Sequence, residues 1–254
     1  MSAVLTFEEV AAGYRGRTVL RDITVSFAAG TVTGLVGPNG AGKTTLFRVA
    51  LRLIEADSGD VRLMTRSLAG WSAPALARAL AYLPQEAEAH WPVEARRLVA
   101  LGRLPHRGRF APLSELDERA IEDALMRCDA IQLAERRVDA LSAGERARVL
   151  LARALTVQAP MLLADEPAAH LDPAHQLRLM ELLRMEARRG TAVIVTLHDL
   201  SLASRYCDRI VVMDTGRVIA DGDASSALSD QVLNSAFAIR ARRIESAVVP
   251  WERA

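Results

Sequence analysis

The chain has 254 residues, of which half are hydrophobic and a quarter are charged, so we expect a soluble globular protein of one large domain or two closely joined ones. Its formal net charge of +1 excludes nucleic acid as a bulk electrostatic partner. Aromatic residues make up only 4% of the chain, which indicates a core built mostly from Leu, Val, Ile and Ala.

Nothing in the sequence indicates secretion or a membrane span. The start "MSAVLTFEEV" lacks both a basic region and an apolar run, so no signal peptide is expected. The longest apolar runs, such as "AVIV" and "MLLA", are far shorter than the roughly 20 residues that cross a bilayer. The isolated cysteines Cys128 and Cys207 fit reduced thiols in a cytoplasmic protein. Any membrane role would therefore depend on docking onto another chain.

The first part of the chain reads mainly as strands. Residues 3–27 predict short extended segments, and "TVTGLVG" (31–37) predicts a buried strand. A glycine-rich turn follows, and then "KTTLFRVALRLI" predicts a helix from residue 43. "DSGDVRL" indicates a turn that leads into another strand, so a small antiparallel sheet is expected beside the main one. "LARALAYLPQ" ends at Pro84, which cannot donate to a continuing ladder.

Helices dominate from about residue 86 to residue 158. "PVEARRLVALGR" and "SELDERAIEDALMRC" are amphipathic, and the second opens with Ser114 and Asp117 at the spacing of a capping box. "GERARVLLARALTVQ" predicts a third helix, which stops before Pro160.

An alternating α/β pattern then returns. The strand "MLLAD" is followed by a helix with Asp172 suited to the N-cap and Pro173 to the first helical position. The strand "TAVIVTL" precedes the helix "DLSLASRY", and "RIVVMD" and "RVIADG" flank Thr215 and Gly216 as a hairpin. The sequence therefore predicts an α/β fold with a mostly parallel sheet, helices on both faces and a helical insertion. We expect one domain in three parts, namely an α/β core (1–85 and 159–225), a helical part (86–158) and a tail (226–254).

"GPNGAGKTT" is a phosphate-binding loop in the context that this motif requires, since it follows a predicted strand and opens a predicted helix. Its glycines let successive N–H groups point at phosphate oxygens, and the helix N-terminus adds a positive dipole end. The expected nucleotide contacts are Gly37, Pro38, Asn39, Gly40, Ala41, Gly42, Lys43, Thr44 and Thr45. Within this set, Thr44 is expected to ligate Mg²⁺.

Lys43 is the only lysine in the chain, and every other basic residue is arginine. An incidental lysine in a glycine-rich turn is the alternative interpretation. However, a compact ammonium fits inside a tight backbone loop against the β- and γ-phosphates, whereas the broad fork of arginine does not. The exception therefore favours a functional lysine.

Four further segments resemble the motifs of ABC ATPases. "LSAGERARVLLARAL" (141–155) resembles the signature motif, and "MLLADEP" (161–167) resembles the Walker B strand with its catalytic glutamate. "AHLD" (169–172) resembles the D-loop, and "VTLHD" (195–199) resembles the switch-histidine segment. The order and spacing match over nearly the whole chain. The resemblance implies a P-loop NTPase (RecA-like) core with a small antiparallel β subdomain, a helical signature subdomain, and an ATPase that uses ATP and Mg²⁺.

The resemblance also assigns individual residues. Tyr14 lies where the family stacks an aromatic ring on adenine, and Gln85 lies in the Q-loop, where it would ligate Mg²⁺. Asp165 would hold Mg²⁺ mostly through water, Glu166 would orient the attacking water, and His198 would contact the γ-phosphate. Without these flanking motifs, the two carboxylates would read as a solvated acidic turn and His198 as a structural residue. The other histidines, His90, His106, His170 and His175, form no pair with metal-ligand spacing, and His90 and His106 read as surface or interface residues.

In ABC proteins the nucleotide lies between the phosphate loop of one subunit and the signature helix of the other. Ser142 and Gly144 match the signature positions that contact the γ-phosphate, so a homodimer with sandwiched ATP is implied. Two departures from the family's LSGGQ are Ala143, which adds a methyl group, and Glu145, which adds a negative charge. We expect Arg146 and Arg148 to offset that charge, and hydrolysis to be tuned rather than abolished.

"ALGRLPHRGRF" (100–110) resembles a stretch in ATPases of importers for iron–siderophore, haem and vitamin B12, and the tail resembles that group too. The alternative for "RLPHRGRF" is a solvated basic loop. The resemblance implies an ATP-driven motor at the cytoplasmic face of the plasma membrane, which couples to separate permease subunits and indirectly to a substrate-binding protein. An ABC exporter, an importer of another substrate and, as a weaker alternative, a non-transport ABC ATPase stay open.

Overall fold

The computed structural model describes residues 3–14, 16–85, 92–108 and 111–254. His90, residues 86–91 of the expected helical part and residues 109–110 of "RLPHRGRF" lie outside the described residues. The chain divides into two compact units, residues 1–71 with 183–254 (unit 1) and residues 72–182 (unit 2).

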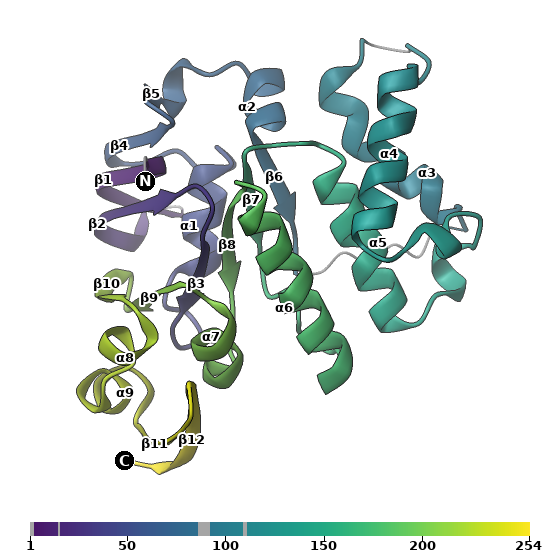
Figure 1. Ribbon diagram of the computed structural model, residues 1–254. Helices are drawn as coiled ribbons and strands as arrows, with labels where there is room; N and C mark the ends of the chain where they lie inside the picture. Colours follow the sequence, from purple (N-terminus) through teal and green to yellow (C-terminus); the bar gives the residue numbers. More distant parts are fainter. Residues whose placement is uncertain (1–2, 15, 86–91, 109–110) are drawn as a thin grey trace. The chain divides into compact units, whose positions relative to one another are not determined.

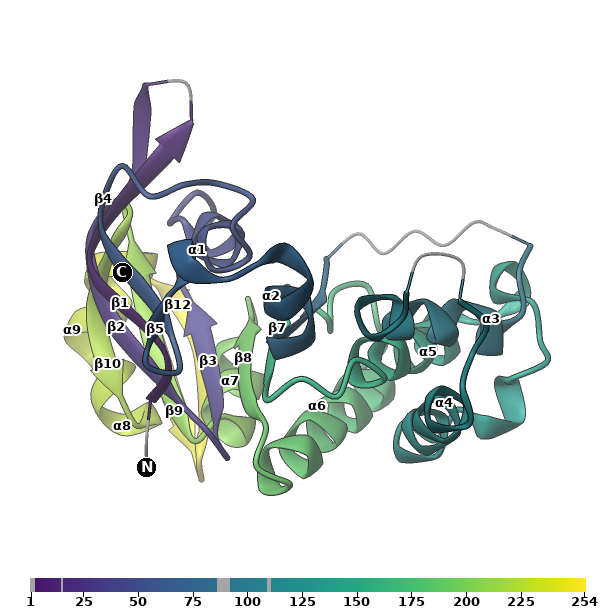
Figure 2. The ribbon, with the colours of Figure 1, turned by 90° about the horizontal axis from the view of Figure 1, so that it is seen from above.

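Unit 1 contains two sheets and a C-terminal hairpin (Figures 1 and 2). Its first half holds β1 (Ala3–Tyr14), β2 (Arg17–Ala28), β3 (Val32–Val36), α1 (Lys43–Ala50), β4 (Ser58–Leu63), β5 (Arg66–Ser67) and the 3₁₀ turn η1 (Leu68–Gly70). Its second half holds β8 (Ala192–Thr196), α7 (Leu200–Tyr206), β9 (Arg209–Asp214), β10 (Arg217–Gly222), α8 (Ala224–Ala227), α9 (Asp230–Phe237), β11 (Ile239–Ile244) and β12 (Ala247–Arg253).

The main sheet of unit 1 is mixed but mostly parallel. Strand β3 pairs in parallel with β8 on one side and with β9 on the other, and β10 closes the edge as an antiparallel hairpin partner of β9. Every residue of β3 and β8 is buried, as expected for central parallel strands. Thr215 and Gly216 both have positive φ, which confirms the predicted turn of that hairpin.

The second sheet of unit 1 is antiparallel, with the strand order β2-β1-β4-β5. The expectation of short segments over residues 3–27 was wrong, because β1 and β2 are each 12 residues long and pair along that length. The reason is a set of register shifts, one of them between Phe7 and Val10, where Glu9 has a positive φ of 52°. Such bulges interrupt the polar–apolar alternation without ending the strand.

Unit 2 is mainly helical. It contains α2 (Ala73–Ala79), β6 (Leu80–Leu83), α3 (Ala95–Ala100), η2 (Leu101–His106), α4 (Glu115–Arg127), η3 (Ile131–Leu133), η4 (Val138–Ala140), α5 (Ala143–Leu155) and β7 (Met161–Ala164). Helix α6 (Pro173–Arg188) begins in unit 2 and ends in unit 1. Helices α3, α4 and α5 pack on one another, and β6 pairs in parallel with β7.

The helix starts follow the sequence closely. Ser114 and Asp117 form both bonds of the predicted capping box at α4. At α6, Asp172 accepts a hydrogen bond from the backbone N–H of His175, and Pro173 is the first helical residue. These contacts confirm the predicted caps and fix where each helix begins.

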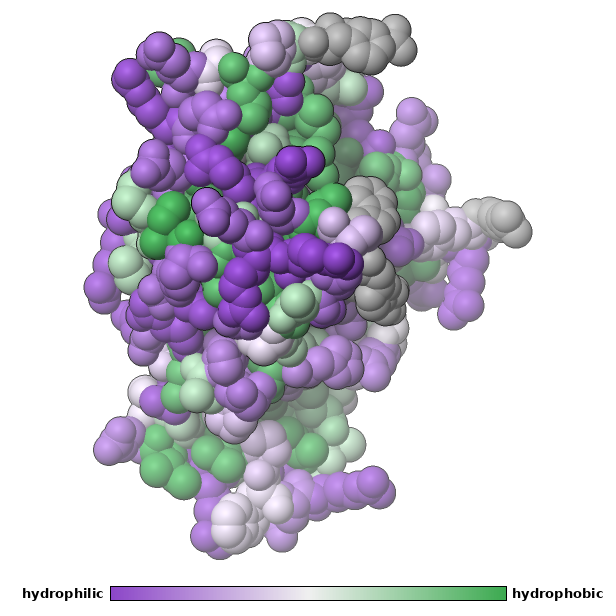
Figure 3. Space-filling view, turned by 90° about the vertical axis from the view of Figure 1, so that its right-hand side faces the viewer, coloured by the Kyte–Doolittle hydropathy of each residue, from purple (hydrophilic) through white to green (hydrophobic). Residues whose placement is uncertain are grey.

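Figure 3 shows one face of the molecule, on which hydrophilic residues cover most of the surface and hydrophobic areas lie between them. Leu116 and Met126, both on α4, are among the exposed large hydrophobic residues. Within the described parts of the chain, no helix is both long and apolar enough to cross a membrane. Taken together, the two units confirm the predicted α/β class with its antiparallel sheet and helical region.

Candidate functional site

The phosphate loop of unit 1 connects the buried strand β3 to α1. Gly40 and Gly42 have φ values of 81° and 103°, in the region that favours glycine. A Cβ added to Gly42 would lie 2.8 Å from Leu20 Cδ2, and one added to Gly37 would overlap the carbonyl oxygen of Met213. The loop therefore owes its tight path to the absence of side chains at these positions.

The Lys43 ammonium lies inside this loop. The residue is only 5% exposed, and its Nζ donates hydrogen bonds to the carbonyl oxygens of Gly37 at 2.7 Å and Pro38 at 3.2 Å. Helix α1 begins at Lys43 without a side-chain cap and without an acidic residue in its first turn. The arrangement places a buried positive charge beside uncapped helix N–H groups, which fits a phosphate group.

Tyr14 lies at the end of β1 and contacts the helix that the loop opens. Its hydroxyl accepts a hydrogen bond from Arg48 Nη1 at 2.9 Å, and the Arg48 guanidinium carbon lies 5.9 Å from the ring centroid. Tyr14 as a whole is 38% exposed. The structure thus places the predicted adenine-stacking residue beside α1, and Arg48 is a neighbour that the motifs did not indicate.

His198 follows the buried strand β8. In the parallel pairing of β3 with β8, Leu35 is the partner of Thr196, and the Leu197 N–H donates to the Leu35 carbonyl oxygen at 3.3 Å. Strand β8 ends at Thr196 and the parallel strand β3 ends at Val36, so His198 and the phosphate loop both follow the carboxyl ends of neighbouring strands. The structure therefore brings His198 and the phosphate loop to one edge of the unit 1 sheet, and His198 is exposed there.

In unit 2, Gln85, Asp165 and Glu166 meet where two parallel strands end. Leu83 of β6 is the partner of Ala164 of β7, and the Asp165 N–H donates to the Leu83 carbonyl oxygen at 2.8 Å. Asp165 is buried, whereas Glu166 is partly exposed and has a positive φ of 47°. Gln85 Nε2 donates to Glu166 Oε2 at 2.5 Å, so an amide two residues after the end of β6 orients the predicted catalytic carboxylate.

The signature segment forms the N-terminus of α5, where Ser142 is the N-cap. Ser142 Oγ accepts a hydrogen bond from the Glu145 N–H at 3.3 Å, and Glu145 Oε2 accepts one from the Ser142 N–H at 2.9 Å. The departure at Glu145 is therefore the third helical residue of a capping box. The spacing of Ser142 and Glu145 in the sequence could have revealed this box.

The residue that pairs with Glu145 is Arg136, whose Nη1 lies 2.8 Å from Glu145 Oε1. The residues expected to offset this charge, Arg146 and Arg148, have other bonding partners. Arg148 pairs with Asp129, and Arg146 donates to the Leu141 carbonyl oxygen. The pKa of Glu145 lies below its ordinary value, chiefly because the Ser142 backbone N–H stabilises the carboxylate.

A pocket of about 310 Å³ separates α5 from the ends of β6 and β7 within unit 2. Its polar lining consists of Gln85, Arg146, Glu166 and His170, and its apolar lining includes Ala143 and Leu150. The pocket therefore joins the Gln85–Glu166 pair to the first turns of the signature helix. Within the described segments, no group of three or more His, Cys, Asp or Glu side chains could hold a metal ion.

The "RLPHRGRF" segment is anchored at its first residue. Arg103 is 6% exposed, donates to Asp117 Oδ1 and the Thr156 carbonyl oxygen, both at 2.8 Å, and also bonds to Gln158. The alternative interpretation of this segment as a solvated basic loop is therefore wrong for Arg103. His106 is exposed, as predicted, and its Nε2 lies 2.8 Å from the Val157 carbonyl oxygen. These contacts fix η2 to the C-terminal end of α5.

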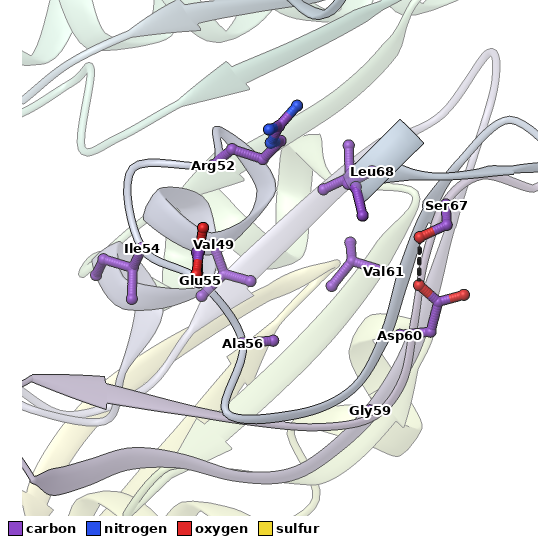
Figure 4. A pocket seen from close by; sticks show the side chains of 11 residues that line it. Val49, Arg52, Ile54, Glu55, Ala56, Gly59, Asp60, Val61, Ser67 and Leu68 are labelled. Atoms are coloured by element: carbon purple, nitrogen blue, oxygen red, sulfur yellow. Dashed lines mark hydrogen bonds between the residues drawn. The ribbon is translucent and has the colours of Figure 1, made fainter. Parts of the chain in front are cut away.

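A second pocket, of about 420 Å³, lies in unit 1 beside the C-terminal end of α1 (Figure 4). Val49, Val61 and Leu68 point toward one another there. Ser67 Oγ donates to Asp60 Oδ1 at 2.7 Å, and Arg52 Nη1 donates to the Trp71 carbonyl oxygen at 2.5 Å. These polar groups already have partners, and none of the predicted site residues lines this pocket.

Comparison with known proteins agrees with this geometry. A family model described as ABC transporter matches residues 20–169. A hemin import ATP-binding protein of Rhodococcus jostii is 42% identical over 236 residues, which cover 93% of this chain and 80% of that protein. An iron(3+)-hydroxamate import ATP-binding protein of Bacillus subtilis is 35% identical, with coverage of 93% and 88%. The structure of cbiO1 from Clostridium perfringens, part of an ABC transporter complex, has a TM-score of 0.81 and 26% identity, and covers 92% of this chain and 95% of that one.

Proposed function

This chain belongs to the ABC transporter family, and we propose that it drives the import of haem, iron–siderophore or cobalamin through a separate permease. ATP-binding subunits of this family are ATPases, so the chain binds and hydrolyses ATP. The observation that carries the importer proposal is the similarity, over 93% of this chain, to import proteins for hemin and iron(3+)-hydroxamate.

The phosphate loop is proposed to hold the triphosphate. Lys43 would exchange its bonds to the Gly37 and Pro38 carbonyl oxygens for the β- and γ-phosphates, because both sets of acceptors suit a compact ammonium. The backbone from Gly37 to Thr45 would supply N–H donors, and Tyr14 would stack on adenine. The buried position of Lys43 supports this role, since its charge is already desolvated.

Magnesium would be held by Thr44, Gln85 and Asp165, whose oxygen atoms suit this hard cation. The ion would neutralise charge on the β- and γ-phosphate oxygens. Asp165 supports the assignment because its carboxylate is buried at the end of β7.

Glu166 is proposed to orient and polarise the attacking water, while His198 hydrogen-bonds the γ-phosphate. The Gln85 amide bonded to Glu166 would keep that carboxylate in one orientation. Ser142 and Gly144 would meet the γ-phosphate bound to a second copy of the chain, so two ATP molecules would be sandwiched in a homodimer. The partly exposed N-terminus of α5 is consistent with this contact.

We further propose that permease subunits dock on the side of unit 2 that carries η2. The anchoring of Arg103 on the end of α5 would let this docking segment and the signature helix move as one body. The chain would then act peripherally at the cytoplasmic face of the plasma membrane. A substrate-binding protein would deliver the solute to the permease, without direct contact with this chain.

Substitution of Glu166 tests the catalytic part of the proposal. Glu166→Gln should lower ATP hydrolysis by about 100-fold or more, because a positioned base contributes that much, while ATP binding is retained. The exposed residue Glu135 provides the matched control Glu135→Gln, which should hydrolyse ATP at the parent rate. Hydrolysis at the parent rate by Glu166→Gln would remove Glu166 from the catalytic role.

Transport by the reconstituted complex tests the importer part. With its co-purified permease in proteoliposomes, the chain should drive vanadate-sensitive uptake of hemin, an iron–hydroxamate chelate or cobalamin, with stimulated ATP hydrolysis. Movement of these solutes only in the outward direction would indicate an exporter. Absence of both stimulation and transport for all three solutes would reject the proposed substrate class.

A further inference from the structure

The imidazole ring of His175 lies against Gly144, the second residue of α5. A Cβ added at Gly144 would overlap Cδ2, Nε2 and Cγ of this ring. Both residues belong to unit 2, and Gly144 is buried. The ring thus occupies the space that a side chain would need, and only glycine at position 144 permits the contact.

The ring is also held from the other side. His175 Nδ1 lies 2.8 Å from Asp172 Oδ2, and the His175 backbone N–H donates to Asp172 Oδ1 at 3.0 Å. The pKa of Asp172 is lowered, first by the His175 backbone N–H and then by the imidazole. Asp172 therefore fixes both the start of α6 and the orientation of the ring that touches Gly144.

The residues between Glu166 and His175 are tied together. The Ala169 N–H donates to the Glu166 carbonyl oxygen at 3.0 Å, and Gln176 Nε2 donates to the Ala168 carbonyl oxygen at 3.2 Å. A shift of the Glu166 segment therefore reaches Asp172 and His175 through bonded neighbours. From His175, the next contact is the first turn of the signature helix.

We propose that His175 is a positioning residue that couples the segment after Glu166 to the signature turn of the same subunit. It acts through Gly144, and its orientation depends on Asp172. The inference rests on the proposed function, in which Ser142 and Gly144 meet the γ-phosphate held by the partner. Loss of the Asp172–His175 link would leave the signature turn poorly oriented for that contact, while ATP still binds to the phosphate loop.

The test uses the full chain with Glu166→Gln, which retains ATP. Three quantities are measured: the Kd of a fluorescent ATP analogue for the monomer, the ATP concentration that gives half-maximal dimer by analytical ultracentrifugation, and the Tm. His175→Ala should raise the half-maximal ATP concentration about tenfold or more, while the monomer Kd changes less than twofold. That loss equals about 1.4 kcal/mol of coupling.

Two further variants separate coupling from space filling. His175→Phe keeps a ring against Gly144 but cannot donate to Asp172, so it should weaken dimerisation as much as His175→Ala. Parent-like dimerisation by His175→Phe would show that packing alone matters and would overturn the inference. Glu181→Ala, on the same helix and paired only with Arg178 among the described contacts, is the control and should match the parent.

The contact itself is tested by Gly144→Ala. This change should lower the Tm when His175 is present and should lower it much less in the His175→Ala chain, because the ring no longer clashes with the added methyl group. Equal lowering in both chains would show that the ring and the glycine do not touch, and would overturn the inference.

Ser142→Ala distinguishes the inference from the proposed function. If Ser142→Ala weakens ATP-dependent dimerisation and His175→Ala does not, the coupling through His175 is rejected while the signature role stands. If neither variant weakens it, the proposed contact of the signature motif with the γ-phosphate fails instead.

Discussion

The N-termini of α1 and α5 are both proposed to meet the phosphates of ATP, yet they are built in opposite ways. Helix α1 starts after Gly42 with no side-chain cap and no acidic residue in its first turn. Helix α5 starts with a complete capping box, in which Ser142 and Glu145 satisfy each other's backbone N–H groups. One helix leaves its first N–H donors to an anion, whereas the other has already satisfied two such donors with its own side chains.

The charges follow the same contrast. A buried ammonium, that of Lys43, stands beside the start of α1, and a carboxylate, that of Glu145, stands at the start of α5. The start of α1 therefore attracts a phosphate without help from a second subunit. At the start of α5, a phosphate must bind beside the Ser142–Glu145 capping box or replace one of its hydrogen bonds. This suits a contact that forms only when two subunits close on ATP.

The largest effect is expected at α1. Lys43→Arg should reduce ATP hydrolysis by about 10²–10³-fold, because the guanidinium cannot occupy the enclosed position of Nζ between the Gly37 and Pro38 carbonyl oxygens. Steady-state ATPase assays and binding titrations with a fluorescent ATP analogue would measure the loss. A matched control is Arg119→Lys on the exposed face of α4, which should leave both quantities unchanged. Near-normal turnover of Lys43→Arg would mean that ATP hydrolysis does not depend on the compact shape of the Lys43 ammonium at the start of α1.

A third helix, α4, shows what happens when the acid of a capping box is buried. Asp117 accepts from Ser114 and also pairs with the buried Arg103, so Asp117→Asn should lower the free energy of unfolding by about 3 kcal/mol. Arg103, followed by Ser114, holds the pKa of Asp117 well below its usual range. The stabilisation is therefore complete above the ordinary Asp pKa of about 4 and is lost as the pH falls toward the folded value.

Urea unfolding of the parent and of Asp117→Asn between pH 7 and pH 2 would check this. The difference between the two should be largest near neutral pH and should shrink in acid. Equal acid sensitivity of both chains would show that other carboxylates dominate the acid transition.

Local chemistry explains why the phosphate loop and the helix caps could be predicted from sequence. The glycine pattern around Lys43 and the spacing of Ser114 and Asp117 act over a few residues, and both predicted arrangements are present. Asp172 and Pro173 likewise define the start of α6 without help from distant segments.

Contacts between distant segments were the ones that the sequence could not predict. Glu145 pairs with Arg136, nine residues earlier, because the connection through η4 brings that side chain back to the start of α5. The basic residues on α5 itself bond elsewhere, as Arg148 does with Asp129. The contact of His175 with Gly144 depends on the positions of two helix starts, which no short spacing encodes.

A moderate effect is expected at the α5 cap. Ser142→Ala removes the hydroxyl that accepts the Glu145 N–H, so the free energy of unfolding should fall by about 1 kcal/mol. Ser114→Ala is the matched change at α4, where the same type of bond is 3.2 Å long. Thermal unfolding of both variants would measure the caps side by side. A loss of stability at α4 without one at α5 would show that the α5 box contributes little before ATP binds.

The smallest effect, and the most direct test of the contrast, is expected for Glu145→Gln. A glutamine can still accept the Ser142 N–H, so the cap remains while the negative charge and the pair with Arg136 are lost. That pair is partly exposed to solvent, which screens it, so stability near pH 7 should change by less than about 1 kcal/mol. In the Glu166→Gln chain, the ATP concentration for half-maximal dimerisation should fall about two- to fivefold, since one charge beside a helix N-terminus contributes about 0.3–1 kcal/mol.

The pH dependence separates charge from capping. Because the pKa of Glu145 is lowered in the folded chain, the parent's cap is at full strength above about pH 4.3 and weakens as the pH falls below that value, whereas the glutamine cap does not titrate. Unfolding curves of parent and variant should therefore converge or cross in acid. If Glu145→Gln required more ATP for dimerisation, the carboxylate would be assisting closure, and the start of α5 would be adapted to a phosphate despite its charge.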